Sequence, residues 1–192
     1  MNGGWRTLAL CLCGALHGVA LAQPVVYVLD PQHSFVHFEV MHFGTSTLRG
    51  RIGPIDGAVE LDRPAGAGSV SLMVRTATVD TGMAFFDKRL RQDDLLASQS
   101  DPVAYFVASR FVFDGAALRG VRGEITWRGV SQPLELVATR FACHTHPTLA
   151  REVCGGDFEG ELKRGDFGAS FGMPFVANRV RLLVQAEGIR QP

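Results

Sequence analysis

The chain has 192 residues, of which 46% are hydrophobic and 20% charged, and its formal net charge is zero. This length suits one domain with a substantial core and is short for two. A neutral chain lacks the basic surface with which nucleic-acid-binding proteins displace counterions, so no nucleic acid is expected as a partner. Glycine and proline, with 22 and 9 residues, are too few for a disordered or fibrous protein.

The N-terminus has the features of an export signal. Arg6 is followed by a nearly uninterrupted apolar run over residues 8–21, and Ala20-Leu21-Ala22 provides the small-x-small pattern of a cleavage site. The run of 14 residues (21 − 8 + 1) is shorter than the roughly 17 to 25 that a transmembrane helix needs. We therefore expect residues 1–22 to be a cleaved signal peptide, residues 23–192 to form the domain, and the protein to be periplasmic.

In the remaining chain apolar and polar residues alternate, which is typical of half-buried β-strands. The clearest example is residues 35–42, where Val36, Phe38 and Val40 lie on one face. The same pattern predicts further strands at residues 27–29, 55–61, 69–75, 103–113, 121–128, 134–138, 158–163 and 180–186. Gly, Pro and Asp residues separate these segments as turns. The sequence thus predicts one all-β domain with eight or nine strands.

One segment departs from this period and predicts a short helix. Residues 83–96 contain Asp87 and Arg91 at i,i+4 spacing, which favours a helical ion pair. Thr81, just before the segment, has a side chain suited to capping the first turn. A helix inserted between strands could close one end of a barrel.

A sheet of about eight meandering strands avoids exposed edges most simply by closing on itself. The interior of such a barrel is either filled by side chains or wide enough for one small ligand. Alternation alone does not say which face lies inside. An outer-membrane barrel turns its apolar face outward between aromatic girdles, but this chain has only two Tyr and two Trp. We therefore expect an eight-stranded antiparallel barrel with an apolar interior and one short helix.

Short motifs follow one another along the whole domain. They are Tyr27-Val28-Leu29-Asp30, His33-Ser34, His42, Gly50, Asp87, Leu90, Asp94-Leu95-Leu96, Pro102, Phe106, Gly123 to Thr126, Gly129 and Arg164 with Asp166-Phe167-Gly168. In this order and spacing, over about residues 27–188, the chain resembles the YceI-like family of polyisoprenoid-binding periplasmic proteins. The resemblance implies a lipocalin-like barrel whose elongated cavity holds a long isoprenoid chain, without a catalytic set. Arg89 departs from the family pattern, where we expect a histidine, and Leu95-Leu96 replaces a more aromatic pair.

The apolar face of the strands provides the candidate wall of that cavity. A buried methylene contributes roughly 0.8 kcal/mol, so an isoprenoid gains strongly from a dry channel with few polar groups. The candidate lining residues are Val36, Phe38, Val40, Val70, Leu72, Val74, Phe106, Ile125, Trp127, Leu134, Leu136, Leu182 and Val184. Whether they contact a ligand or only fill a solid core stays open, because small barrels can be packed shut.

Asp30, His33 and Ser34 are the residue types of a hydrolytic triad. Neighbouring residues on an extended strand point to opposite faces, so His33 and Ser34 cannot pair directly there. We expect Asp30 and Ser34 to bind turn backbone at the entrance of the strand, and we expect no enzymatic activity. A hydrolase built around Ser34 ranks last among the functions considered.

Cys143, His144, His146 and Cys154 form a dense group of potential metal ligands. Two histidines on one face of a strand and two cysteines could complete a Cys2His2 zinc shell, although the CxxC spacing is missing. In an oxidising compartment the two cysteines are expected to form a disulfide, which closes a loop of 12 residues (154 − 143 + 1) and contributes about 3 kcal/mol. We favour the disulfide and assign no metal.

The sequence therefore predicts a periplasmic carrier that sequesters or shuttles an isoprenoid lipid, either a polyprenyl lipid or a quinone tail. No cofactor is expected besides this ligand. The alternative is a metal- or haem-associated redox accessory protein that uses the Cys143/His144/His146/Cys154 cluster. A transient contact with a membrane or membrane protein stays open, as does the choice between monomer and homodimer.

Overall fold

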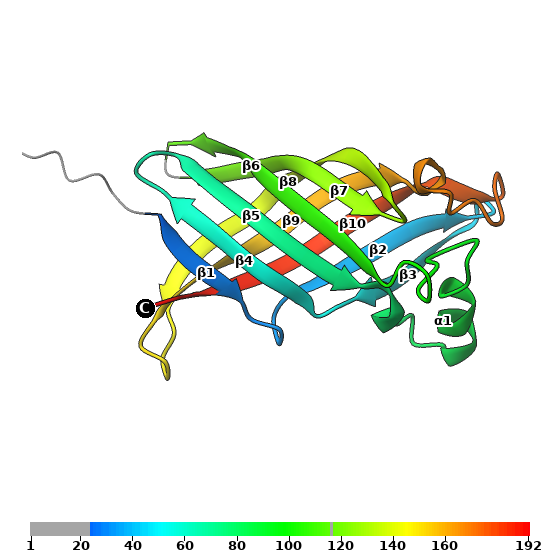
Figure 1. Cartoon of the computed structure of the whole chain (residues 1–192), viewed down its shortest axis with the longest axis horizontal. Coiled ribbons are helices and arrows are strands. Elements are labelled where there is room, and N and C mark those ends of the chain that lie inside the picture. Colours follow the sequence, from blue (N-terminus) through cyan, green and yellow to red (C-terminus); the bar gives the residue numbers. More distant parts are fainter. Residues whose placement is uncertain (1–23, 116) are drawn as a thin grey trace, which may run out of the picture.

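The computed structural model of the chain describes residues 24–115 and 117–192, so the expected signal peptide at residues 1–22 lies outside the described residues. The described chain forms an elongated barrel with the short helix α1 at one end (Figure 1). Its strands are β1 Val25–Leu29, β2 Phe35–His42, β3 Ser46–Ile52, β4 Ile55–Asp62, β5 Ala67–Arg75, β6 Val103–Asp114, β7 Ala117–Trp127, β8 Val130–Thr145, β9 Glu152–Lys163 and β10 Val176–Arg190. Its helices are the 3-10 turns η1 Thr76–Thr78 and η2 Arg164–Phe167 and the α-helix α1 Ala84–Leu90. Among the described helices, none is long and apolar enough to span a bilayer.

Eight strands close the ring. The strand order is β1-β4-β5-β6-β7-β8-β9-β10, and β10 pairs again with β1, every pair being antiparallel. The β2–β3 hairpin extends the wall, because β2 pairs with residues 176–185 of β10 whereas β1 pairs with residues 188–190. β1 and β2 thus pair with the same edge of β10, β2 along residues 176–185 and β1 along residues 188–190. The predicted eight-stranded antiparallel barrel with one short helix is confirmed.

The helical segment completes the wall beside β3. Arg51 of β3 and Asp80 exchange two backbone hydrogen bonds, each 2.9 Å from N to O. The chain that leaves β5 therefore continues the hydrogen bonding of the sheet before it forms α1. This connection fixes α1 at the end of the barrel.

The apolar face of the sheet lies inside the barrel. Eleven buried residues from β1, β4 to β8 and β10 form one core cluster, and the outer face carries rows of ion pairs. Glu39 on β2 binds Arg49 of β3 at 2.7 Å and Arg181 of β10 at 3.0 Å, and Arg181 also binds Glu159 of β9 at 2.9 Å. Exposed pairs of this kind stabilise by only about 0 to 1 kcal/mol each, but they show which face meets water. A lipid-facing exterior would not carry such charges.

The helix is shorter than predicted, and the proposed cap is wrong. It spans Ala84–Leu90 rather than residues 83–96, and its N-cap residue Met83 makes no capping hydrogen bond through its side chain. Thr81 instead donates its N–H at 2.8 Å and its hydroxyl at 2.6 Å to Oδ1 of Asp87. The carboxylate of Asp87 in the helix therefore binds the loop before it, whereas the prediction had the side chain of Thr81 capping the helix.

The predicted ion pair between Asp87 and Arg91 is also replaced. Arg91 donates to the carbonyl oxygens of Ala77 at 2.8 Å and Val79 at 3.1 Å. The helix ends at Leu90, so Arg91 is free to fasten α1 to the loop that contains η1.

One strand was missed, and several others, among them β8, β9 and β10, are longer than predicted. β3 was not predicted, because Gly50 interrupts the apolar face between Leu48 and Ile52. That glycine is needed, since a Cβ at this position would come within 2.5 Å of the Phe38 ring on β2. β8 covers Val130–Thr145 instead of residues 134–138, and a bulge after Ala138 hides the continuation of its alternating pattern.

Candidate ligand cavity

The barrel interior contains two adjoining apolar cavities. The larger has a volume of about 200 Å³ and the smaller about 80 Å³. Four side chains line both of them: Leu72 of β5, Phe106 of β6, Leu136 of β8 and Val184 of β10. We call these four residues the waist. The waist divides the interior into a large chamber and a small chamber.

The large chamber lies toward α1. Leu90 of the helix and Leu95 and Leu96 of the following turn line it, together with side chains of the surrounding strands. Arg128, in the turn between β7 and β8, donates to the Leu95 carbonyl at 2.7 Å. Leu95 is thus held on the chamber wall by a contact across the end of the barrel.

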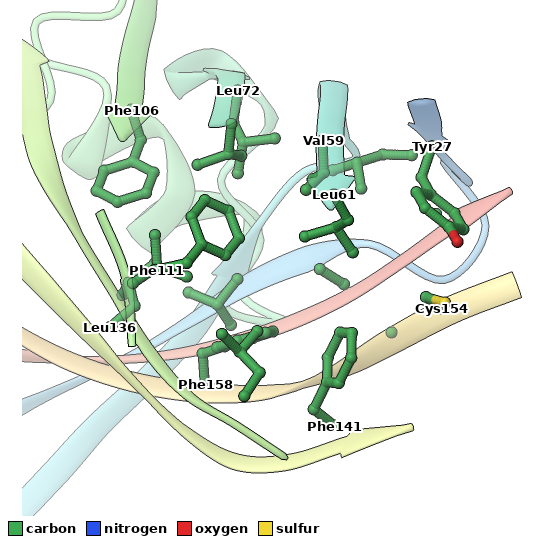
Figure 2. Close-up of a pocket in the computed structure, with 18 residues that line it drawn as sticks. Tyr27, Val59, Leu61, Leu72, Phe106, Phe111, Leu136, Phe141, Cys154 and Phe158 are labelled. Carbon is green, nitrogen blue, oxygen red and sulfur yellow. The ribbon is translucent and has the colours of Figure 1, made fainter. Parts of the chain in front are cut away.

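The small chamber lies at the opposite end of the barrel. Figure 2 shows Phe111, Phe141 and Phe158 around it, with Tyr27 and Cys154 closing it on one side. The buried Tyr27 donates its hydroxyl to Oε2 of Glu152 at 2.7 Å. Apolar side chains therefore surround this chamber, and the hydroxyl of Tyr27 is bound to a carboxylate instead of facing an empty space.

An ion pair supports this closed end from outside. Arg63 donates to Oε1 of Glu152 at 2.6 Å. The hydrogen bond from Tyr27 lowers the pKa of Glu152, and despite the opposing effect of burial the Arg63 guanidinium lowers it further. Burial and the bond to Glu152 raise the pKa of Tyr27 above its ordinary value of 10.0. The pair therefore works as an anionic acceptor and a neutral donor at neutral pH.

The expected disulfide joins the two strands at this end. Cys143 of β8 and Cys154 of β9 are direct partners in the ladder, and their sulfur atoms are bonded. Cys154 is buried and packs against Tyr27 and Leu61. The disulfide thus forms part of the wall of the small chamber.

The geometry does not assemble the alternative zinc shell. Among the described residues, the potential ligand atoms gathered here belong to Cys143, Glu152 and Cys154, within 4.8 Å of one another, and the two sulfurs are bonded to each other. His144 and His146 are not part of this group. Nδ1 of His146 accepts hydrogen bonds from the backbone of the following turn instead.

The buried guanidinium of Arg164, which lines the large chamber, is bound by three backbone carbonyls. Arg164 donates to the carbonyl oxygens of Ala169, Val176 and Ala177 at 2.7, 2.8 and 2.8 Å. The three hydrogen bonds of Arg164 hold the loop between η2 and β10 in place. Burial lowers the pKa of Arg164.

Trp127 also lines this chamber, and its buried indole N–H has no acceptor among the described residues.

The residues of the hydrolase hypothesis are not arranged for catalysis. Ser34 is fully buried, and its hydroxyl exchanges two hydrogen bonds of 3.2 Å with the backbone N–H and carbonyl of Glu187 on β10. The half-exposed His33 binds Oδ2 of Asp30 at 2.7 Å. The expected turn contact of Asp30 is confirmed, because it accepts the Gln32 N–H at 2.9 Å. The turn contact predicted for Ser34 is wrong, since its partner is β10.

A Gly-x-Ser-x-Gly pattern at Gly168 to Gly172 escaped the sequence analysis. In hydrolases this pattern forms a sharp turn from a strand into a helix. Here it follows η2 in the loop that leads to β10. The hydroxyl of Ser170 makes no hydrogen bond to a histidine within the described part of the chain. The match therefore does not form a nucleophile elbow.

All 13 predicted wall residues line the cavities. Val70 lines the small chamber, the four waist residues line both, and the other eight line the large chamber. Their contact with a ligand stays a prediction. Three further aromatic residues of the small chamber, Phe111, Phe141 and Phe158, were not predicted. Bulges between Ala108 and Arg110 and between Ala138 and Arg140 shift the inward-facing positions before two of them.

A closed antiparallel barrel with an apolar double cavity defines a protein of the ligand-binding barrel class. The chain belongs to the YceI-like family, because residues 27–188 match the YceI-like domain. A UPF0312 protein of Azotobacter vinelandii is 33% identical over 196 residues, covering 97% of this chain and 98% of that protein. Protein YceI of Escherichia coli O157:H7 is 31% identical over 188 residues, covering 96% and 97%.

Solved structures share the fold. BcnA of Burkholderia cenocepacia superposes with a TM-score of 0.67 at 19% identity, covering 83% of this chain and 98% of that chain. A polyisoprenoid binding domain from Saccharophagus degradans, implicated in plant cell wall breakdown, gives a TM-score of 0.62 at 16% identity and covers 86% and 98%. At these identities the likeness concerns the architecture of the barrel.

Proposed function

We propose that this protein is a periplasmic carrier that sequesters or shuttles an isoprenoid lipid, either a polyprenyl lipid or a quinone tail. The carrier performs no chemistry of its own. The observation that carries the proposal is the pair of apolar chambers joined at the waist. The polyisoprenoid binding domain with the same fold supports the ligand class, and family membership supports a binding role.

The chambers fit a flexible apolar chain better than a polar ligand. A cavity of about 150 Å³ holds one benzene, or roughly 25 Å³ per carbon, so the 200 Å³ chamber has room for about eight carbons. That corresponds to roughly one or two isoprene units of five carbons. The buried cation Arg164 is already bound to three carbonyls, which leaves the wall to select by shape and apolar contact.

Export supports the same role. A cleaved signal at residues 1–22 would deliver the barrel to a compartment in which the Cys143–Cys154 disulfide is stable. An intact mass that begins at Gln23 is the expected result for protein recovered from the periplasm. Retention of residues 1–22 would argue against this part of the proposal.

Native mass spectrometry of protein purified without detergent, followed by mass analysis of its organic extract, tests the ligand. We expect one isoprenoid per protein chain. A folded protein that is empty after purification and stays empty after incubation with polyprenols and ubiquinones would refute the carrier. A coloured or zinc-containing preparation would instead revive the redox alternative.

A further inference from the structure

One end of the barrel exposes an unusual number of large apolar side chains. We call this set the rim, and it consists of Met41, Phe43, Met83, Phe85, Phe171, Met173 and Phe175. These residues come from the β2–β3 turn, the start of α1 and the loop between η2 and β10. All three elements lie at the α1 end of the barrel in Figure 1. Exposed apolar residues gathered in one place mark interaction sites more often than scattered ones do.

Specific contacts hold the rim in place. The rings of Phe43 and Phe175 stack with centroids 5.4 Å apart, and the Phe43 N–H donates to the Phe175 carbonyl at 2.7 Å. The guanidinium of Arg89 lies 3.8 Å from the centroid of Phe171 and binds both carboxylate oxygens of Asp94 at 2.7 Å. Arg89, the residue that departs from the family pattern, thus joins the helix to the loop before β10. The rim is therefore a surface assembled from three elements.

The rim is electrically neutral. Its three segments, residues 41–48, 81–86 and 169–178, contain no Asp, Glu, Lys or Arg. Residues 87–94 beside them contain three acidic and three basic residues, which balance. At the opposite end, Arg63 lies in the β4–β5 turn and Arg151 in the β8–β9 turn. The rim segments themselves are thus uncharged, and the charges beside them balance.

Phe43 occupies a backbone conformation that does not suit it. Its φ is +51°, in the left-handed region, and Gly44 follows at +68°. Asn or Gly adopts this conformation at lower cost, and a bulky residue there is uncommon. The side chain of Phe43 is 58% exposed, so burial in the barrel does not repay the strain. One contact of the ring is the stack on Phe175, and its exposed part is available to a partner outside the chain.

We propose that the rim docks on the surface of a lipid bilayer, beside the large chamber into which an isoprenoid would pass. The inference rests on the proposed function, because a bilayer is where such a lipid dissolves. Aromatic side chains are enriched where proteins meet the membrane interface. Because the rim has no net charge, docking requires neither anionic lipid nor low salt. Three protruding elements around the chamber end suit a soft lipid surface better than the flat face of a second copy.

Vesicle flotation with the full chain tests the docking. We expect binding to pure phosphatidylcholine vesicles, unchanged by added phosphatidylglycerol or by raising the salt from about 0.05 to 0.5 M, because the Debye length matters little for a neutral surface. Phe85→Asp and Phe175→Asp should each weaken binding about tenfold or more, from the lost apolar burial. Val137→Asp is the control, since Val137 is an apolar residue that is 51% exposed but lies on the side wall. Its binding should equal that of the wild type.

A second variant separates docking from folding. Phe43→Asn should keep or raise the melting temperature, because asparagine relieves the left-handed strain, and should still weaken vesicle binding. No floating protein, equal binding by rim and wall variants, or rim variants that change only a monomer–dimer equilibrium would each overturn the proposal.

The proposed function is tested separately by loading a polyprenol from ethanol without vesicles. Rim variants should retain it as the wild type does, yet extract it from vesicles more slowly. If the wild type retains nothing after loading from ethanol, the carrier function fails, whatever the vesicle result. If rim and wall variants extract the lipid at the same rate, docking fails and the carrier function stands.

Discussion

The waist predicts how chain length is selected. Val184 lines both chambers, so Val184→Phe places a larger side chain in the passage between them. The small chamber of 80 Å³ has room for about three carbons at roughly 25 Å³ each, part of one isoprene unit. A long isoprenoid would lose the burial of those carbons, whereas a short one would stay in the large chamber.

The size of the effect follows from the lost burial. Three carbons at roughly 0.8 kcal/mol each amount to about 2.4 kcal/mol, or about fiftyfold in affinity, as an upper limit. Because buried area converts incompletely into affinity, we expect about a tenfold loss for a chain of eight units. A chain of two units should bind within about threefold of the wild type. The extra volume should also cost about 1 to 3 kcal/mol of stability.

Fluorescent isoprenoids of about two to eight units, titrated into protein freed of bound lipid, provide the assay. Val180→Phe is the matched control, because Val180 lies on the same strand and lines only the large chamber. That variant should weaken binding of short and long chains alike. Equal losses for all lengths in Val184→Phe would show that the ligand does not cross the waist.

Three further predictions concern stability. Replacing Cys143 and Cys154 by serine should lower the free energy of unfolding by about 3 kcal/mol, as measured by urea titration of the oxidised protein and the variant. Gly123→Ala should cost about 1 to 3 kcal/mol, because its Cβ would lie 2.2 Å from the Val107 carbonyl oxygen. The hydrogen bond to Asp30 raises the pKa of His33 above 6.5. The exposed pair therefore contributes to the free energy of unfolding below pH 6.5, by under about 1 kcal/mol. This contribution is lost as the pH rises through the pKa of His33 in the folded state. His33→Asn should remove that part of the pH dependence in urea titrations between pH 6 and 8.

The acid side of the same pair has the opposite sign. Burial opposes the shift, but the hydrogen bonds from His33 and the Gln32 backbone lower the pKa of Asp30 below 3.8. Its contribution is therefore present above pH 3.8 and is lost as the pH falls through the folded-state value. A variant whose pH profile matches the wild type would refute the role of this pair. Unchanged denaturation midpoints in the serine or alanine variants would refute the other two predictions.

Local patterns determined much of the barrel. The alternation in residues 35–42 predicted both the strand and the inward face of Val36, Phe38 and Val40, because side chains of an extended chain alternate with period two. The pairing of the two cysteines was predicted correctly, because two cysteines 11 positions apart can close a short loop. Where a strand contains a bulge the period shifts, which is why Phe111 and Phe141 escaped prediction.

Other features depended on partners far away in the sequence. Thr81 and Arg91 bind groups that the fold brings next to them, so propensity for capping and for i,i+4 pairing gave the wrong partners. The hydroxyl of Ser34 binds the backbone of Glu187 on β10, 153 residues later, so no local pattern could predict this contact.

The sequence by itself determined an all-β chain with one apolar face, because local alternation depends only on neighbouring residues. The tertiary structure alone decided that this face surrounds two chambers with a waist between them. It also decided that three uncharged segments, widely separated along the chain, meet at one end of the barrel. Closure of the ring fixes the register of each strand against its neighbours, and no local pattern of residues contains that information.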